Sequence, residues 1–330
     1  MMWLTWRQHR RQVLVTGAAL LVLAALMVPT GLMTRNAYAD KGLAECVGVL
    51  TSAQSTPDRA EACNRALHQF SDQFGSLSML GVLFLVLPLV VGLFWGAPLV
   101  AREVEQGTHR FAWTQGVSRR RWALVKFGFV AVVTTVVAVV YGLGMSWWAA
   151  PLTQAAEQSR FDVFFFDMQG AVPIGYTLFA VALGVCAGVF WPRMMSAMAV
   201  TLGGFVGLRI VLTVLARPHY LPQETRTFPI AGATADLSAS FGDWIVEKGI
   251  RDASGTMVLS GAQANCPPDA SEPGGATCRP LVEFGDGAYN WQLYQPADRF
   301  WLFQAIETGI FVALAALLLY LAARRIRRVA

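Results

Sequence analysis

The chain has 330 residues, of which 55% are apolar and only 14% are charged, and its mean hydropathy is +0.46. Soluble domains carry about 25% charged residues, so this composition excludes an ordinary water-soluble protein. The net charge is +5, but the basic residues cluster beside long uncharged segments. That distribution does not indicate nucleic-acid binding.

Six apolar segments are long enough to cross a bilayer, which takes roughly 20 helical residues. They lie at 13–33, 75–100, 127–149, 172–191, 196–216 and 300–323. The first four contain no Asp, Glu, Lys or Arg, whereas the fifth contains Arg209 and the sixth contains Glu307. Because continuous apolar runs exclude barrel strands, the sequence predicts an all-α polytopic membrane protein with six transmembrane helices. The fourth and fifth helices would form a tight hairpin broken at Pro192.

Basic residues set the predicted orientation of these helices. With the N-terminus in the cytoplasm, the inner segments hold 14 Lys and Arg in 49 residues, against 11 in the 146 residues of the outer segments. Four arginines between Arg324 and Arg328 follow the last span as a stop signal. Both termini are therefore expected in the cytoplasm, with residues 217–299 outside.

The first span has one rival interpretation. A secretory signal has a basic segment, an apolar run and a cleavage site in that order, and the sequence offers Arg7 to Arg11, an apolar run and then Ala37-Tyr38-Ala39. Signal cores usually have about 7–15 residues, whereas this apolar run has 21. Its length favours a retained transmembrane helix.

Four of the five cysteines fall in the predicted outer segments. Since disulfides form on the oxidising side of a membrane, the pairs Cys46–Cys63 and Cys266–Cys278 are predicted. The alternative is four free or metal-binding thiols, but no CxxC pair or nearby His has ligand spacing, and no metal site is expected. Cys186 lies within a span, where it is expected to be a small packing residue.

The outer segments have the composition of ordered structure. Residues 61–72 favour a short amphipathic helix, and the FDVFFF sequence at 161–166 fits either the headgroup zone or one turn of buried helix. Residues 217–299 alternate apolar clusters with Gly and Pro breaks, which suggests a small mixed extracytoplasmic domain. Its Pro- and Gly-rich loop at 266–280 would be closed by the second disulfide.

Enzyme signatures are absent from the sequence. It contains no HExxH, GxSxG or GxxxxGK[ST] motif, and its four His residues lie outside the predicted spans. Arg209 and Glu307 are the only charged side chains at predicted membrane depth. Catalysis by this chain is therefore not expected.

The inner loop at 101–126 has the most informative sequence, AREVEQGTHRFAWTQGVSRRRWALVK. It opens with acidic residues and ends with basic ones. Gly107 and Thr108 break a first short helix, and Ser118 is placed to cap a second. Such a charged double turn suits a contact with another protein. The alternative is a solvated loop that simply obeys the positive-inside rule.

This loop resembles the signature stretch of ABC-2 type transporter permeases, a cytoplasmic turn of the form E…E-x-G-T…Q-x-V-S-R-x-R-W…K. The opening WLTWRQHR at 3–10 and the run YQPADRFWLFQAIE at 294–307 resemble the actinobacterial branch of that family. A content of 23 Arg against three Lys fits a GC-rich genome. The resemblance covers nearly the whole chain, and the outer domain is the part that matches least.

The resemblance implies a type V exporter-like fold and the transmembrane subunit of an ATP-driven exporter in the bacterial plasma membrane. In that family the turn matching 101–121 is a coupling helix that docks on a separate ATPase subunit, and residues 1–12 match an amphipathic connecting helix. The residues expected at the ATPase contact are Glu103, Glu105, Gly107, Thr108, Gln115, Ser118, Arg119 and Arg120. ATP and Mg²⁺ would bind to the partner, and this chain would carry no cofactor.

Six helices form half of a translocation pathway in such exporters, so two permease subunits, identical or related, and two ATPase subunits are expected in the lipid membrane. The expected cargo is hydrophobic or amphipathic: a drug, antibiotic, lipid or peptide. One alternative is a membrane-anchored receptor or assembly factor whose outer domain binds a ligand without transport. An importer needs a soluble binding protein outside, so the built-in outer domain favours export.

Arg209 and Glu307 are predicted to form an ion pair inside the membrane. Each lies eight residues from the outer end of its span, and a lone charge costs about 2.5–3.5 kcal/mol at a helix centre. A structural role is favoured over one beside the cargo path. The alternative is that Arg209 snorkels to the headgroups while Glu307 lines a wet cavity.

Close helix packing is predicted at two glycine pairs, Gly184 with Gly188 and Gly203 with Gly207. Small residues four positions apart let helix backbones approach each other in membranes. The alternative is that glycine is simply frequent in transmembrane helices.

Overall fold

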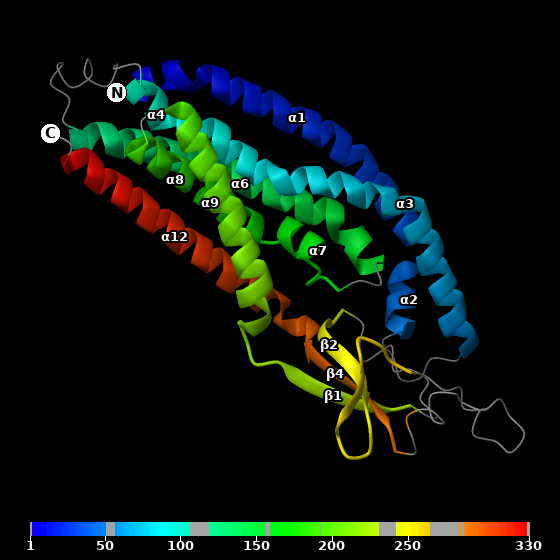
Figure 1. Cartoon of the computed structure of the whole chain (residues 1–330). Helices are drawn as coiled ribbons and strands as arrows, with labels where there is room; N and C mark the ends of the chain where they lie inside the picture. The colour runs from blue at the N-terminus through cyan, green and yellow to red at the C-terminus, as the bar shows by residue number, and fades with distance from the viewer. Residues whose placement is uncertain are drawn as a thin grey trace, which may run out of the picture.

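The computed structural model describes residues 2–50, 57–105, 119–155, 159–191, 193–230, 242–264, 284 and 287–328. Long helices form an elongated bundle, with both chain ends at one end of it and a small β-sheet at the other (Figure 1). We call these the terminal end and the sheet end.

Helices account for most of the described chain. The first half contains α1 (Met2–Asp40), α2 (Leu43–Leu50), α3 (Pro57–Val91), the π-helical turn η1 (Gly92–Gly96), α4 (Ala97–Glu105) and α6 (Arg119–Ala155). The second half contains α7 (Val163–Met168), α8 (Val172–Phe190), α9 (Met194–Val211), the π-helical turn η2 (Leu212–Ala216), the short turns η3 (Arg217–His219) and η5 (Ala297–Arg299), and α12 (Phe300–Arg328).

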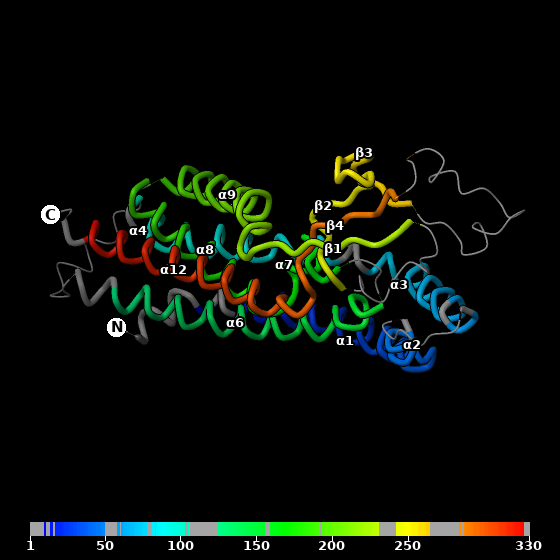
Figure 2. Tube along the Cα trace, turned by 90° about the horizontal axis from the view of Figure 1, so that it is seen from below, coloured from blue at the N-terminus to red at the C-terminus, as the bar shows by residue number. Residues whose placement is uncertain are grey.

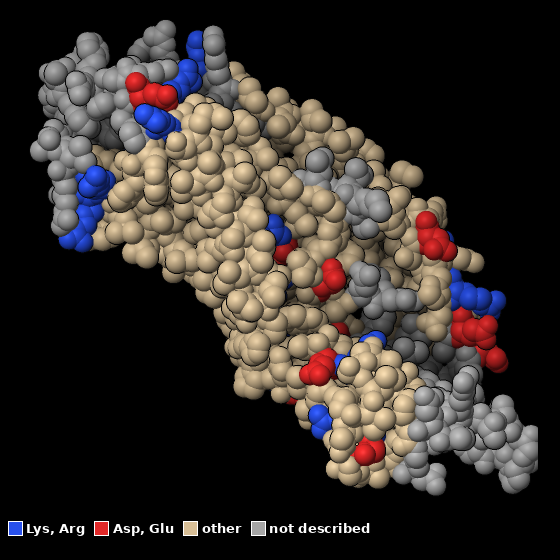
Figure 3. All heavy atoms as spheres, viewed as in Figure 1, with Lys and Arg blue, Asp and Glu red and all other residues tan. Residues whose placement is uncertain are grey.

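Six helices in the described part of the chain are long and apolar enough to cross a membrane. They cover Gly17–Asp40, Phe84–Arg102, Leu124–Ala155, Val172–Phe190, Met194–His219 and Ala297–Ile326. Each overlaps one of the six predicted segments, so the predicted polytopic helical fold is confirmed at this level. Figure 3 shows charged side chains gathered towards the two ends of one face, with a broad, mostly uncharged zone between them.

Several helices extend beyond the predicted spans. Residues 61–72 form part of the 35-residue helix α3 rather than a separate short helix. Helix α1 is continuous from Met2 to Asp40, so the segment 1–12 runs into the first span without a break. Its role as a connecting helix stays a prediction.

The cysteines that can be placed agree with their predicted roles. Cys46 of α2 and Cys63 of α3 form a disulfide, which fastens this helical hairpin at the sheet end. Cys186 is a free, buried thiol within α8, as expected of a packing residue. The predicted Cys266–Cys278 bond lies outside the described residues.

A proline inside α3 leaves one carbonyl oxygen without its helical partner. Pro88 has no N–H, so the oxygen of Phe84, four residues earlier, loses its usual hydrogen bond. The buried hydroxyl of Tyr141, on α6, donates to that oxygen at 2.7 Å. Within a bilayer no water replaces a lost backbone bond, so Tyr141 completes the backbone of its neighbour.

Pro151 has the same effect on the carbonyl oxygen of Trp147 within α6. Arg35 of α1 donates from Nη2 to that oxygen at 2.7 Å, and its guanidinium carbon lies 4.9 Å from the centroid of the Trp147 ring. A polar side chain from an adjacent helix therefore compensates for each of these two prolines and sets how α1, α3 and α6 lie against one another.

The β-sheet joins the end of α9 to the start of α12. Its strand order is β1 (Glu224–Pro229), β4 (Tyr289–Gln295), β2 (Trp244–Arg251) and β3 (Met257–Ser260), and all neighbours are antiparallel. Trp244 stacks on Phe161 with ring centroids 5.7 Å apart, and Ser159 donates to the Gly242 carbonyl at 2.9 Å. The sequence prediction of a strand-containing unit within 217–299 is confirmed, whereas its extracytoplasmic placement stays a prediction.

Helix α8 lies deep within the bundle, and 78% of its apolar window is buried. Figure 2 shows α9 and the sheet towards one side of the molecule and α1 with α6 towards the other. A Cβ atom added at Gly184 would lie 2.6 Å from the backbone nitrogen of Ala97, and one at Gly188 would lie 2.8 Å from the Ala97 oxygen. The predicted close packing at this glycine pair is confirmed, and its partner is α4.

The second glycine pair was assigned wrongly within this chain. An added Cβ at Gly203 or Gly207 would meet no described atom within 4 Å. Helix α9 packs instead through the face that carries Ala197, Thr201 and Phe205, its buried residues. The glycines lie two positions further along the helix, about 200° around its axis, and so face away from the bundle.

The two glycine pairs lead to a matched prediction. Gly184→Leu should destabilise the protein by about 1–3 kcal/mol or more, because the new side chain meets the backbone of α4. Gly207→Leu should leave stability within about 0.5 kcal/mol. Thermal unfolding of the detergent-solubilised chain measures both; equal melting temperatures for the two variants would contradict the packing described.

The bond between Tyr141 and Phe84 predicts a non-additive double-mutant cycle. Tyr141→Phe should cost about 0.6–2 kcal/mol, the range of single hydrogen bonds in membrane bundles. In a Pro88→Ala background the same change should cost much less, because the alanine supplies the backbone N–H that the Phe84 carbonyl needs. Equal costs in the two backgrounds would show that Tyr141 acts only through packing.

Candidate functional site

Four charged side chains meet at the sheet end of the bundle, and we call them the charge cluster. They are Asp167 of α7, Arg209 of α9, Arg217 of η3 and Glu307 of α12. The side chains of Asp167 and Glu307 are fully buried, that of Arg217 is 1% exposed, and that of Arg209 is 18% exposed. Two positive and two negative groups make the cluster neutral as a whole.

Arg217 lies at the centre of the cluster. Its Nη2 atom is 2.6 Å from Oδ1 of Asp167 and 2.7 Å from Oε1 of Glu307, and its Nε donates to Oε2 of Glu307 at 2.9 Å. Its guanidinium also lies 4.2 Å from the centroid of the Phe166 ring. Two carboxylates and an aromatic face thus compensate a cation that has almost no access to solvent.

Arg209 does not pair with Glu307, so the predicted direct ion pair is wrong. Arg209 donates to Oδ2 of Asp167 at 2.5 Å, and Glu307 is bound by Arg217 instead. The physical reason is competition, since Asp167 and Arg217 lie at the same depth and offer shorter contacts. The two predicted residues belong to one network, in which Asp167 and Arg217 stand between them.

Two tyrosine hydroxyls complete the network. Tyr176 of α8 donates within reach of both carboxylates, at 2.9 Å from Asp167 and 2.5 Å from Glu307. Tyr220, just beyond the span that contains α9, donates to Glu307 at 3.3 Å. Burial and the nearby Glu307 carboxylate raise the pKa of the Tyr220 hydroxyl, so it stays protonated and serves as a donor.

Helix α7 brings Asp167 into the bundle. Asp162 caps it by accepting from the Phe164 N–H at 3.0 Å, and Phe165 and Phe166 on the helix are buried. Of the two interpretations of the FDVFFF segment, the turn of buried helix is therefore confirmed. Asp167 follows these aromatic residues and is buried with them.

Gln304 of α12 holds the connection from α7 to α8. Its Oε1 accepts from the backbone N–H groups of Ala171 at 3.1 Å and Val172 at 3.0 Å, and its Nε2 donates to the Phe166 carbonyl at 2.9 Å. Gly170 lies in this turn with a φ of 68°, a conformation that favours glycine. Gln304 and Glu307 are one turn apart on α12, so one helix face binds α7 directly through Gln304 and binds Arg217, the partner of Asp167, through Glu307.

Sequence reasoning missed Asp167 and Arg217. The predicted spans 172–191 and 196–216 place both residues just outside the membrane helices, where charge is ordinary. The available signal for Asp167 was a single acidic residue within an aromatic segment. In the sequence FFFDM, burial of the aromatic side chains would bury Asp167 with them. For Arg217, the signal was its position directly after an apolar run.

The predicted ATPase contact lies at the terminal end, mostly outside the described residues. Glu103 and Glu105 belong to the last turn of α4, and Arg119 and Arg120 open α6. Glu105 accepts from the backbone N–H of Met194 at 3.2 Å, which connects the end of α4 to the start of α9. The remaining predicted residues, Gly107, Thr108, Gln115 and Ser118, lie in the part that the structure leaves undescribed.

These features define a polytopic membrane protein with a buried ionic network near the sheet end and a contact between the end of α4 and the start of α9 at the terminal end. Among the described residues, no group of three or more His, Cys, Asp and Glu side chains is arranged to hold a metal ion. A family model described as "ABC-2 membrane transporter related" matches residues 17–217. That match covers more than half of the chain, and the protein therefore belongs to this family. No curated protein and no solved structure matches the chain.

The charge cluster predicts an order of damage among neutralising substitutions. Asp167→Asn should cost about 3–5 kcal/mol of stability, because it leaves two buried arginines with a single carboxylate. Arg209→Gln should cost less, since Arg209 is 18% exposed and Asp167 keeps its contact with Arg217. Denaturant unfolding in detergent measures both, with Asp72→Asn on the exposed part of α3 as the control.

Two results would contradict this account of the cluster. One is an Arg209→Gln variant less stable than Asp167→Asn. The other is recovery of stability in the exchange Arg209→Glu with Glu307→Arg, because the observed bonds join these residues to other partners.

Proposed function

We propose that this chain is the permease subunit of an ATP-binding-cassette exporter, which moves a hydrophobic or amphipathic cargo across the bacterial plasma membrane. Membership of the ABC-2 related family carries the proposal. The six candidate spans support it, because they supply the helices of a translocation pathway. Cargo identity and direction are parts of the proposal.

The partners follow from the same proposal. Two copies of a separate ABC ATPase subunit, each with ATP and Mg²⁺, would dock at the terminal end, and a second permease subunit would complete the pathway. Both termini would lie in the cytoplasm and the β-sheet outside. The position of both chain ends opposite the sheet supports this orientation (Figure 1).

The contacts of α4 suggest how ATPase movements would reach the membrane helices. The segment that follows Glu105 in the sequence would be the docking site, and Glu105 is bound to the first residue of α9. Helix α4 also lies against the backbone of α8 at Gly184 and Gly188. Helices α8 and α9 in turn carry Tyr176 and Arg209 into the charge cluster. A push on that segment would therefore be transmitted along two helices to the opposite end of the bundle.

The test is ATP hydrolysis by the reconstituted complex of this chain with a candidate ABC ATPase subunit from the same genome. The wild-type complex should hydrolyse ATP faster when amphipathic compounds are added. Glu105→Gln should lower the stimulated rate by about three- to tenfold, since it weakens a charge-assisted bond worth about 1.5 kcal/mol at the low end. Glu61→Gln, an exposed residue of α3 at the sheet end, is the matched control.

Two outcomes would overturn the proposal. If no ATPase co-purifies with the chain and vesicles containing it move no compound, the receptor or assembly-factor alternative is favoured. If Glu105→Gln and Glu61→Gln hydrolyse ATP equally fast in a stable complex, α4 is not the coupling element.

A further inference from the structure

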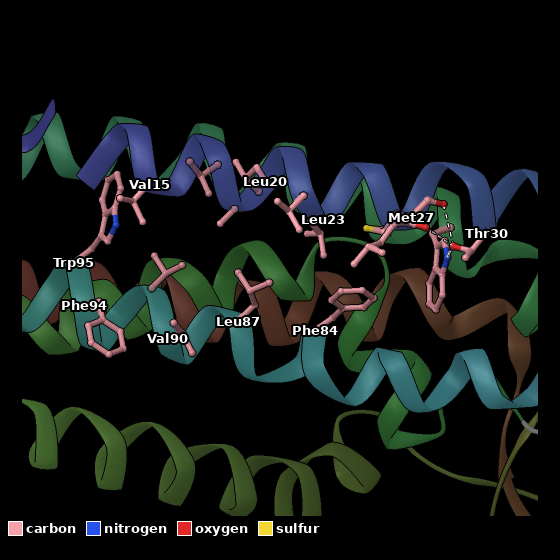
Figure 4. Close-up of a pocket in the computed structure, with 16 residues that line it drawn as sticks. Val15, Leu20, Leu23, Met27, Thr30, Phe84, Leu87, Val90, Phe94 and Trp95 are labelled. Atoms are coloured by element: carbon pink, nitrogen blue, oxygen red, sulfur yellow. Dashed lines mark hydrogen bonds between the residues drawn. The ribbon is translucent and has the colours of Figure 1, made fainter. Parts of the chain in front are cut away.

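An elongated cavity of about 480 Å³ lies between α1, α3 with η1, and α6. Figure 4 shows side chains of α1 and of α3 with η1 facing each other across it. It extends along α1 from Val15 to Thr30, which is about 22 Å at 1.5 Å per residue. Both ends of this stretch lie in or next to the first candidate span, so the cavity is at membrane depth. We call it the α1 groove.

The lining of the α1 groove is almost entirely hydrocarbon. Val22, Leu26 and Phe94 are among its side chains, and they are 56–63% exposed in the chain. Its polar side-chain atoms come from Thr30 and two tryptophan indoles, and the Trp148 indole donates to the Thr30 hydroxyl at 3.0 Å. No charged side chain is among the described residues that line the groove, so its occupant must be apolar along most of its length.

The shape of the groove suits an extended chain. About 480 Å³ of cavity is spread along about 22 Å of α1, so the groove is long and narrow. The groove is also longer than the roughly 15 Å of hydrocarbon in one leaflet, so a chain that fills it must be extended. One extended acyl chain fits these dimensions.

Arg35 lies beyond the Thr30 end of the groove, on the same helix and towards the sheet end. Five residues, or about 7.5 Å, separate it from Thr30. One of its five N–H donors is used by the Trp147 carbonyl, whereas its Nε atom is buried and has no hydrogen-bond partner among the described residues. The guanidinium therefore has unused capacity for an anion at the end of an apolar channel.

We propose that the α1 groove binds one acyl chain of an anionic phospholipid whose phosphate lies at Arg35. Moving a chain from the bilayer into the groove exchanges one hydrocarbon environment for another, so the hydrophobic effect contributes little. Packing against α1 and α3 holds the chain, and Arg35 supplies the preference for a negatively charged lipid. This binding requires no ATPase and stands independently of the proposed transport function.

Photo-crosslinking of the full-length chain in lipid vesicles tests the proposal. The probes are phosphatidylglycerol and phosphatidylcholine that carry the same diazirine-bearing acyl chain, and labelled peptides are identified by mass spectrometry. Phosphatidylglycerol should label the segments 15–30 and 84–95 about fivefold more strongly than phosphatidylcholine, given about 1 kcal/mol for one basic residue at the surface. Arg35→Gln should abolish this preference while labelling by phosphatidylcholine persists.

Groove-filling variants locate the acyl chain. Ala19→Trp should reduce labelling of both segments severalfold, because Ala19 lines the groove. Ala18→Trp is the matched control, since Ala18 is exposed on the same helix but is not part of the lining. Val90→Phe fills the groove from the opposite wall and serves if Ala19→Trp does not fold.

Each remaining outcome is decisive. Equal labelling by the two lipids in the wild-type chain would overturn the role of Arg35. If the Ala19→Trp and Val90→Phe variants are labelled as strongly as the Ala18→Trp control, the groove is not the binding site. Labelling of α9 in place of α1 and α3 would show that the lipid binds on another face.

Discussion

A guanidinium group with almost no access to solvent needs compensating charge, and Arg217 finds it in Asp167 and Glu307. These carboxylates come from α7 and α12, which are far apart in the sequence, so the ion pairs fix where each of these helices lies. They also fix the chain that leaves α9, because only six residues separate Arg217 from Glu224 at the start of β1. The sheet therefore takes its position from an interaction inside the helix bundle. Gln304 adds to this constraint by binding the backbone on both sides of the α7–α8 turn.

The charge cluster lies towards the sheet end and α4 ends towards the terminal end, and the packing of α8 connects them. Where Gly184 and Gly188 meet α4, backbone lies against backbone, with no flexible side chain between the helices to absorb a displacement. The single Tyr176 hydroxyl, on the same helix, lies within hydrogen-bond distance of both carboxylates of the cluster. A shift of α4 along its axis would thus be felt at Asp167 and Glu307. This connection combines backbone packing with the hydrogen bonds of Tyr176, and neither depends on which cargo the protein carries.

Much of this fold is predictable from the sequence, and the failures have specific physical causes. The spans were predictable because about 20 apolar residues in a row have few other uses. The Cys46–Cys63 bond was predictable because both thiols fall in one short segment on the same side. The partner of Arg209 was not predictable, because equal depth in the membrane identifies possible partners but does not show which of several charges lies nearest. The glycine pair at 203 and 207 failed for a related reason, because small-residue spacing does not reveal which face of a helix is buried.

The prolines explain how an apolar groove can lie beside helices with interrupted backbones. Pro88 and Pro151 each free a carbonyl oxygen next to the α1 groove, at Phe84 and Trp147, and an exposed carbonyl would place an unpaired polar group against hydrocarbon. Tyr141 covers the first and Arg35 covers the second. The side chain of Phe84 lines the groove, and its backbone oxygen is bound by Tyr141 of α6. The apolar character of the groove therefore depends on two polar side chains. Arg35, which binds the freed Trp147 carbonyl, also places a cation beyond the Thr30 end of the α1 groove.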